Sequence, residues 1–102
     1  MDKSCMITLV KSTYTMDEIG QQVETTATRE VFAQVGSVYG AEWHRAGLNG
    51  IKPSYKFTMY DFEYNEEPTV IYEGIEYSVY RTYLSKNETI ELYVEKKAGN
   101  NG

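Results

Sequence analysis

One stretch of the chain, residues 70–94 (VIYEGIEYSVYRTYLSKNETIELYV), constrains the fold more than any other. Within it, Glu73 and Gly74 separate two runs rich in β-branched and aromatic residues. A glycine at the second loop position suits the positive φ of a type I′ two-residue turn. The predicted hairpin pairs Tyr72 with Ile75 and Val70 with Tyr77. This register predicts one core-facing set, namely Val70, Tyr72, Ile75, Tyr77 and Val79.

A second reversal is expected at residues 85–88 (SKNE). Pairing Leu84 with Thr89 across this turn predicts three further pairs: Ile90 with Tyr83, Leu92 with Arg81, and Val94 with Val79. The three strands then form a meander with a single apolar face, which only Arg81 interrupts. We therefore expect Arg81 to have a structural role, either extending to the barrel end or pairing with a carboxylate.

The preceding part of the chain predicts three more strands. Residues 4–11 alternate with apolar side chains on both faces, typical of a strand covered on both sides or meeting another subunit. Residues 12–20 are interpreted as a loop. Residues 21–38 alternate again, and residues 25–29 are either a bend within one long strand or a turn between two. The apolar positions of this region are Val23, Thr25, Val31, Ala33 and Val35.

The strand pattern is broken at residues 39–50, where residues 41–48 could form about two helical turns or stay a mobile loop. Residues 54–64 predict a strand whose apolar face changes from odd to even positions, so we expect a β-bulge near Met59 and Tyr60. We predict a mainly β fold, a small antiparallel β-barrel or sandwich with one short helix or loop insertion at about 39–50.

The chain of 102 residues is long enough for one domain, which we place at residues 1–96, followed by a flexible tail at 97–102. The net charge of −5 disfavours a nucleic-acid binder, because such affinity comes mainly from neutralising phosphates. Ten tyrosines are typical of β-sheets with one solvent-exposed face, or of surfaces that are buried against a partner. A single cysteine, no signal-peptide run and no membrane-spanning segment favour a cytoplasmic protein.

An enzyme is not expected. His44 is the only histidine and lacks the spaced partners that a metal ligand or general base needs. Cys5 lies in an apolar strand, where a lone cysteine usually acts as a small core hydrophobe. We therefore predict no catalytic residue, no cofactor and no metal site.

Negative charge is concentrated between residues 57 and 80, which contain no lysine or arginine. This distribution either faces solvent or forms a negative surface that meets a basic partner or repels passing DNA. The candidate acidic surface comprises Asp61, Glu63, Glu66, Glu67, Glu73 and Glu76.

The order of five blocks resembles a known family. The blocks are VFAQVGSV, AEWHRAGLNGIKP, YKFTMYDFEY, VIYEGIEYSVYRTYL and IELYVEKK. Over residues 31–95 they are similar to the head–tail joining (head-closure, or stopper) proteins of long-tailed bacteriophages and prophages. The matching positions are Val35, Ser37, Val38, Glu42, Ala46, Gly47, Lys52, Pro53, Tyr72, Gly74, Tyr77, Val79, Arg81, Thr82 and Tyr83.

The resemblance implies a structural β-barrel protein of the virion neck, assembled in the bacterial host cytoplasm. Such proteins form a homo-oligomeric ring below the portal and adaptor (head–tail connector) proteins, help to retain packaged DNA and provide the docking surface for tail-end proteins. DNA passes without sequence-specific binding, and no membrane is involved. The alternatives are another neck protein (adaptor or tail completion) and an acidic cytoplasmic β-barrel interaction module.

We expect residues 39–53 to be the working segment, because loops on a rigid scaffold commonly carry contacts. As a gate or inter-subunit segment it would project toward the ring axis or a neighbouring subunit. As a structural cap it would close one end of the barrel with Trp43 buried. The residues assigned to the segment are Glu42, Trp43, His44, Arg45, Leu48 and Lys52.

Overall fold

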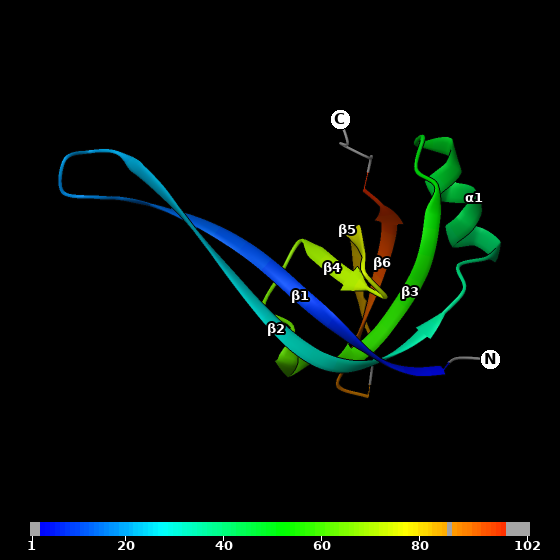
Figure 1. The fold of residues 1–102 in the computed structure, drawn as a ribbon. Helices are drawn as coiled ribbons and strands as arrows, with labels where there is room; N and C mark the ends of the chain where they lie inside the picture. Colours follow the sequence, from blue (N-terminus) through cyan, green and yellow to red (C-terminus); the bar gives the residue numbers. More distant parts are fainter. Residues whose placement is uncertain (1–2, 86, 98–102) are drawn as a thin grey trace.

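Six antiparallel strands close into a barrel in a computed structural model that describes residues 3–85 and 87–97 (Figure 1). The strands neighbour one another in the order β1-β2-β3-β6-β5-β4. In chain order the elements are β1 (Lys3–Met16), β2 (Gln22–Gly36), α1 (Gly40–Leu48), β3 (Pro53–Tyr60), the 3₁₀ helix η1 (Asp61–Glu63), β4 (Thr69–Tyr72), β5 (Ile75–Leu84) and β6 (Thr89–Lys96). The predicted mainly β class with one short helix is confirmed, and the barrel alternative is the correct one.

The barrel interior is filled by side chains from all six strands. Its most deeply buried residues are Ile7, Leu9, Phe57, Val70, Leu92 and Val94. Tyr55 packs edge-on against Tyr72 and Tyr77, with ring centroids 5.4 and 5.6 Å apart. A barrel of this strand number has room for side chains and little else, so its interior is a packed core.

The predicted β4–β5 hairpin is present in its expected register, with Tyr72 opposite Ile75 and Val70 opposite Tyr77. Glu73 and Gly74 both have positive φ, 52° and 79°, as a type I′ turn requires. One member of the predicted core face is wrong, because Ile75 beside the turn is exposed.

The register of β5 against β6 is correct at Val79–Val94 and wrong beyond it. A register shift between Val79 and Arg81 displaces the later pairs by one residue, so Arg81 lies opposite Tyr93 and Leu84 opposite Ile90. Such a bulge changes the face to which the following side chains point. Arg81 consequently leaves the apolar face and pairs with Glu42, so of the two expected outcomes for Arg81 the pairing with a carboxylate is the correct one.

The end of β3 also differs from the prediction. The pairing of β3 with β6 runs without a shift through Met59 and Tyr60, so the expected bulge there is wrong. The strand instead ends at Tyr60, and the chain continues as η1. The apolar residues at even positions after Tyr60 therefore lie outside the strand, so no bulge is needed to explain their change of face. Tyr60 and Phe62 stack on each other at 5.4 Å, and both rings are exposed.

The loop predicted at residues 12–20 is wrong for residues 12–16, which continue β1, and correct for residues 17–20, which lie in the turn before β2 begins at Gln22. The two strands pair without interruption from Lys3–Val35 to Met16–Gln22. Of the two interpretations of residues 25–29, the continuous strand is the correct one. Figure 1 shows the outer part of this hairpin projecting far from the barrel; we call residues 12–26 the arm.

The described residues contain no helix long and apolar enough to cross a membrane. Of the predicted tail, only Lys97 is described, and residues 98–102 lie outside the described part of the chain, as does Lys86 in the predicted turn.

Candidate interaction surfaces

Helix α1 is held against the barrel by Glu42. One carboxylate oxygen, Oε1, accepts hydrogen bonds from Arg45, 3.0 Å away, and from Arg81 of β5. The other oxygen accepts a 3.0 Å bond from the Tyr80 hydroxyl. The Arg81 guanidinium also lies over the Tyr93 ring, 5.4 Å from its centroid. The bulge in β5 thus brings two donors to the helix.

These contacts control the ionisation of Glu42. Burial alone raises the pKa of the carboxyl, but hydrogen bonds from Arg45 and Tyr80 and the charge of Arg81 outweigh burial and hold that pKa below its usual value. Burial and the bond to Glu42 raise the pKa of Tyr80. Glu42 therefore stays a carboxylate at neutral pH and serves as an anchor for α1.

The rest of α1 is largely uncovered. Ala46 is its only buried residue among those described, whereas Trp43 is 48% exposed and Leu48 is exposed. The chain after α1 folds back on the helix, because the Ile51 amide donates to the Ala46 carbonyl at 3.0 Å. This return places Lys52, also exposed, next to the helix end.

The predicted working segment is thus an anchored helix with outward-facing residues. Glu42 and Arg45 make its internal and barrel contacts, while Trp43, His44, Leu48 and Lys52 are open to solvent. This arrangement differs from a mobile loop, and it also differs from a cap with a buried Trp43.

The arm is the second candidate surface, and sequence reasoning missed it. Every residue from Ser12 to Thr26 is exposed, including Tyr14, Met16 and Ile19, the last of them 77% exposed. Beyond Val10, β1 pairs only with β2 among the described strands, so the outer edge of the arm lacks a neighbouring strand. Exposed apolar residues on an open strand edge are typical of a contact surface.

The tip of the arm has a defined structure, which is organised by Asp17. Its carboxylate Oδ1 accepts hydrogen bonds from the amides of Ile19 and Gln21 at 3.0 and 2.8 Å. Its main chain bonds to Gln21 and Gly20, and Gly20 has a φ of +84°. An aspartate that bonds to amides two and four residues later stabilises a tight turn. The arm therefore presents its side chains on an ordered ribbon.

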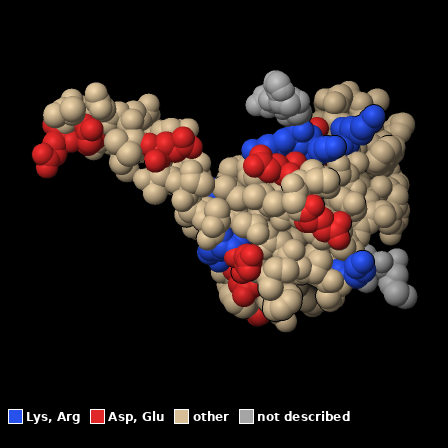
Figure 2. Space-filling model, viewed as in Figure 1, with Lys and Arg blue, Asp and Glu red and all other residues tan. Residues whose placement is uncertain are grey.

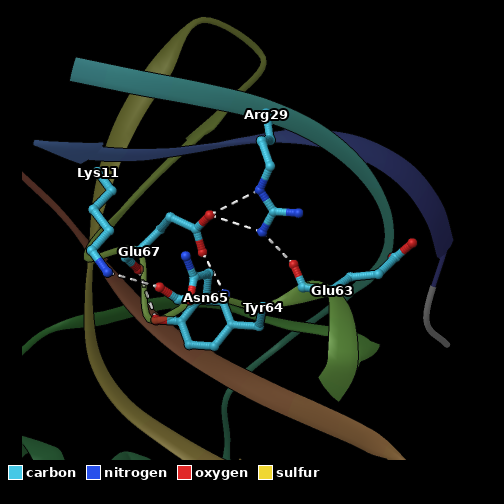
Figure 3. A network of polar contacts seen from close by, with 6 residues as sticks. All are labelled: Lys11, Arg29, Glu63, Tyr64, Asn65 and Glu67. Carbon is cyan, nitrogen blue, oxygen red and sulfur yellow. Dashed lines mark hydrogen bonds and ion pairs between the residues drawn. The ribbon is translucent and has the colours of Figure 1, made fainter. Parts of the chain in front are cut away.

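The candidate acidic surface is divided by the structure. Glu67 is only 4% exposed and accepts hydrogen bonds from Arg29 of β2 at 2.8 and 3.0 Å (Figure 3). Its second oxygen accepts a 2.8 Å bond from the Asn65 amide. Burial raises the pKa of Glu67, but Arg29 and the amide outweigh burial and lower it. Glu67 is a structural residue that ties the β3–β4 connection to β2.

Neighbouring groups complete this network. Arg29 also donates to the Glu63 carbonyl, Lys11 donates to the Asn65 carbonyl at 3.2 Å, and the Tyr64 hydroxyl donates to the Glu67 carbonyl at 2.7 Å (Figure 3). Burial, with the charges of Glu67 and Glu66, raises the pKa of Tyr64 to about 12.

The other acidic residues lie in two places. Asp61, Glu63 and Glu66 belong to η1 and the following loop, while Glu73 and Glu76 lie at the β4–β5 turn. Strand β4 separates the two groups by about 13 Å. Glu76 also faces Lys97, 4.0 Å away. The run of acidic residues in the sequence therefore does not form one continuous surface.

An apolar groove of about 470 Å³ runs across β2, β3 and the start of β6. It is lined by Ser4, Phe32, Ala33, Gln34, Thr58, Met59, Tyr60 and Thr89. Phe32 is the more exposed of the two aromatic side chains that line it, the other being Tyr60. An exposed aromatic at an outward position of a predicted strand was the one available signal for this groove.

The residues considered for chemistry are not assembled into a site. Cys5 is half-buried against the core, and burial raises the pKa of its thiol, which reduces its nucleophilicity at neutral pH. His44 is exposed on α1. Within residues 3–85 and 87–97, no three His, Cys, Asp or Glu side chains are grouped so that they could hold a metal ion. A comparison with models of known protein families finds no match for this chain, and a comparison with curated proteins finds none either.

Proposed function

We propose that the chain is a structural protein of the neck of a long-tailed phage or prophage, a head-closure component of a ring below the portal and adaptor. The observation that carries this proposal is the pairing of a packed barrel with two uncovered surfaces, the arm and α1. A neck protein needs a rigid body and several contact surfaces, because it meets its own copies, the connector above and the tail below.

The barrel interior supports a structural role. Phe57, Leu9 and Leu92 are fully buried inside it, so the barrel is filled by its own core. In this protein the contacts with partners must therefore come from the outside of the barrel. The arm and the exposed side of α1 supply apolar groups for such contacts.

The charge of the chain suits a channel that DNA passes through. A net charge of −5 gives weak attraction to phosphates, so DNA does not adhere to the protein. In the proposed ring, α1 lies toward the axis or a neighbouring subunit, where Trp43 and Leu48 make apolar contacts. His44 and Lys52 are the α1-segment groups available to approach DNA.

The proposal is tested by deleting the gene from the phage or prophage that encodes the chain. We expect DNA-filled heads without tails, whose DNA becomes sensitive to nuclease, and we expect a plasmid copy to restore tailed particles. Electron microscopy with an antibody label should place the restored protein at the neck. Normal numbers of tailed particles without the gene would contradict the proposal.

A second variant tests the contribution of α1. Replacing Trp43 and Leu48 by serine removes the exposed apolar groups and keeps the Glu42 anchor. We expect a folded barrel, measured by circular dichroism, and capsids that lose DNA or tails. The matched control is Thr82→Ser, a conservative change at an exposed position of β5 that keeps both apolar side chains of α1, and it should leave particle numbers unchanged.

A further inference from the structure

The arm exposes several large apolar side chains to solvent. Tyr14, Met16 and Ile19 are all exposed, and the arm contains no lysine or proline, the residues that commonly protect an open strand edge from pairing. The Asp17 turn holds the tip in one shape, so these side chains are presented together. This combination indicates a surface that a partner covers.

The charge of the arm narrows the choice of partner. The arm carries Asp17, Glu18 and Glu24 and has no lysine or arginine. In Figure 2 the projecting arm shows acidic and neutral side chains only, while the largest group of basic side chains in this view lies along the upper side of the body. An apolar and basic surface is therefore the complementary partner.

The chain itself carries such a surface on α1. Trp43 and Leu48 supply exposed apolar groups, and Arg45 and Lys52 supply positive charge. Glu42 is shared between Arg45 and Arg81, so its one negative charge cannot neutralise both guanidinium groups. We call the exposed side chains Trp43, Arg45, Leu48 and Lys52, which lie around the solvent side of α1 and just after it, the α1 face.

The arm cannot reach the α1 face of its own subunit. Strand β2 starts in the arm at Gln22 and ends at Gly36, just before α1, and spans about 46 Å between these ends. Figure 1 shows the arm and α1 on opposite sides of the barrel. The contact must therefore join two copies, with the arm of one meeting the α1 face of another.

We propose that the arm of one copy binds the α1 face of a second copy, which makes a head-to-tail contact between subunits. Such a contact uses two different surfaces, so it repeats from copy to copy and closes into a ring when the rotation allows. The inference deepens the proposed function by naming the subunit contact of the ring, and it rests on that function only for its setting in the neck.

Disulfide crosslinking of the isolated protein tests the contact directly. In a Cys5→Ala background, single variants Ile19→Cys and Leu48→Cys are mixed at millimolar concentration and oxidised. We expect covalent dimers severalfold above the yield of the matched control pair, Ile19→Cys with Phe62→Cys, which probes the region beside the apolar groove. The double variant Ile19→Cys/Leu48→Cys should give a ladder of multimers, because every copy then carries both halves of the contact.

Charge variants test specificity. Glu18→Lys and Lys52→Glu should each lower the crosslinked yield severalfold, and the mixture of the two should restore it, because opposite charges again face each other. Asp17 is left unchanged because it forms the turn. The yield should also fall as salt is raised.

Three results would overturn the inference. Preferential crosslinking to Phe62→Cys would place the arm beside the apolar groove. Crosslinks between two Ile19→Cys arms would show an arm-to-arm contact. No product above the mixed background would show that the arm and the α1 face do not meet. Because the experiment uses the isolated chain, it can succeed or fail independently of the gene deletion that tests the neck function.

Discussion

Strands β1 and β2 cross two environments in one register, and the difference between them separates the body of this protein from its arm. Near the N-terminal end of β1, Ile7 lies opposite Val31, and both are buried in the barrel. Further along the same pair of strands, Thr13 lies opposite Thr25, and both are exposed. The pairing of β1 with β2 is the same in both places. The buried part is the one where β3 and β4 also pair with these strands and close the barrel.

The comparison shows where stability and contact surface reside. In the body, β1 also pairs with β4 at Thr8–Val10 and β2 with β3 at Gln34–Gly36, which closes the barrel around apolar side chains. In the arm each strand has one neighbouring strand, so the main-chain hydrogen bonds form but the side chains stay exposed. Isolated two-stranded ribbons are marginal in water, and the arm is held by the barrel at its base and by Asp17 at its tip.

The largest expected effect comes from emptying the core. Phe57→Ala should lower the free energy of unfolding by about 3–5 kcal/mol, because the Phe57 side chain is fully buried in the barrel interior. The measurement is urea unfolding followed by circular dichroism. The matched control is Tyr14→Ala in the arm, which should change stability by about 0.5 kcal/mol or less. Similar losses in both variants would erase the distinction between body and arm.

A smaller loss of folding stability is expected when the hydrogen-bond network of Glu67 and Arg29 is disrupted. This network joins the β3–β4 connection to β2 near the base of the arm. Glu67→Gln removes a buried carboxylate whose partner Arg29 is 43% exposed, so we expect about 1–3 kcal/mol in urea unfolding. The control Glu66→Gln changes an exposed neighbour and should have an effect within about 0.5 kcal/mol. Equal effects would show that Glu67 is an ordinary surface residue.

The same network predicts how stability depends on pH. The pKa values of Glu42 and Glu67 are lowered in the folded protein from their ordinary value of 4.5. The unfolded chain therefore binds more protons than the folded one as the pH falls through 4.5, so the stabilisation is present above that pH and lost below it. Urea unfolding at several pH values should show a shallower acid loss for Glu42→Gln/Glu67→Gln. Parallel curves for variant and parent would contradict this.

The smallest effect on stability is expected from shortening the arm. Replacing residues 13–25 by Asn-Gly leaves Ser12 paired with Thr26 across a two-residue turn. Because the removed residues are all exposed, the free energy of unfolding should change by less than about 1 kcal/mol. A loss comparable with that of Phe57→Ala would show that the arm belongs to the folding unit.

The sequence predicted the elements whose signals are local. The type I′ turn at Glu73-Gly74, the buried alternation of Val31, Ala33 and Val35, and the short helix all follow from neighbouring residues. The bulge in β5 and the end of β3 could not be predicted, because both depend on which strand or helix meets the chain from far away in sequence. The sequence indicated that Arg81 could pair with a carboxylate. It did not indicate that α1 would supply this carboxylate.

The arm escaped prediction for a related reason. Residues 12–20 are polar with scattered apolar side chains, a pattern that fits a loop as well as an exposed ribbon. Their strand structure comes from pairing with residues 22–28, which are equally exposed, so the alternation that marks a half-buried strand is absent. The sequence likewise suggested α1 as a contact segment but gave no sign of the surface that could meet it.

We expect the arm to be dispensable for folding and, in the proposed neck function, to be required for assembly. This claim is tested most directly by supplying the arm-shortened variant to phage lacking the gene and counting tailed particles by electron microscopy. We predict that the variant accumulates as a folded protein and yields filled heads without tails. Tailed particles in the numbers given by the unaltered protein would contradict the claim.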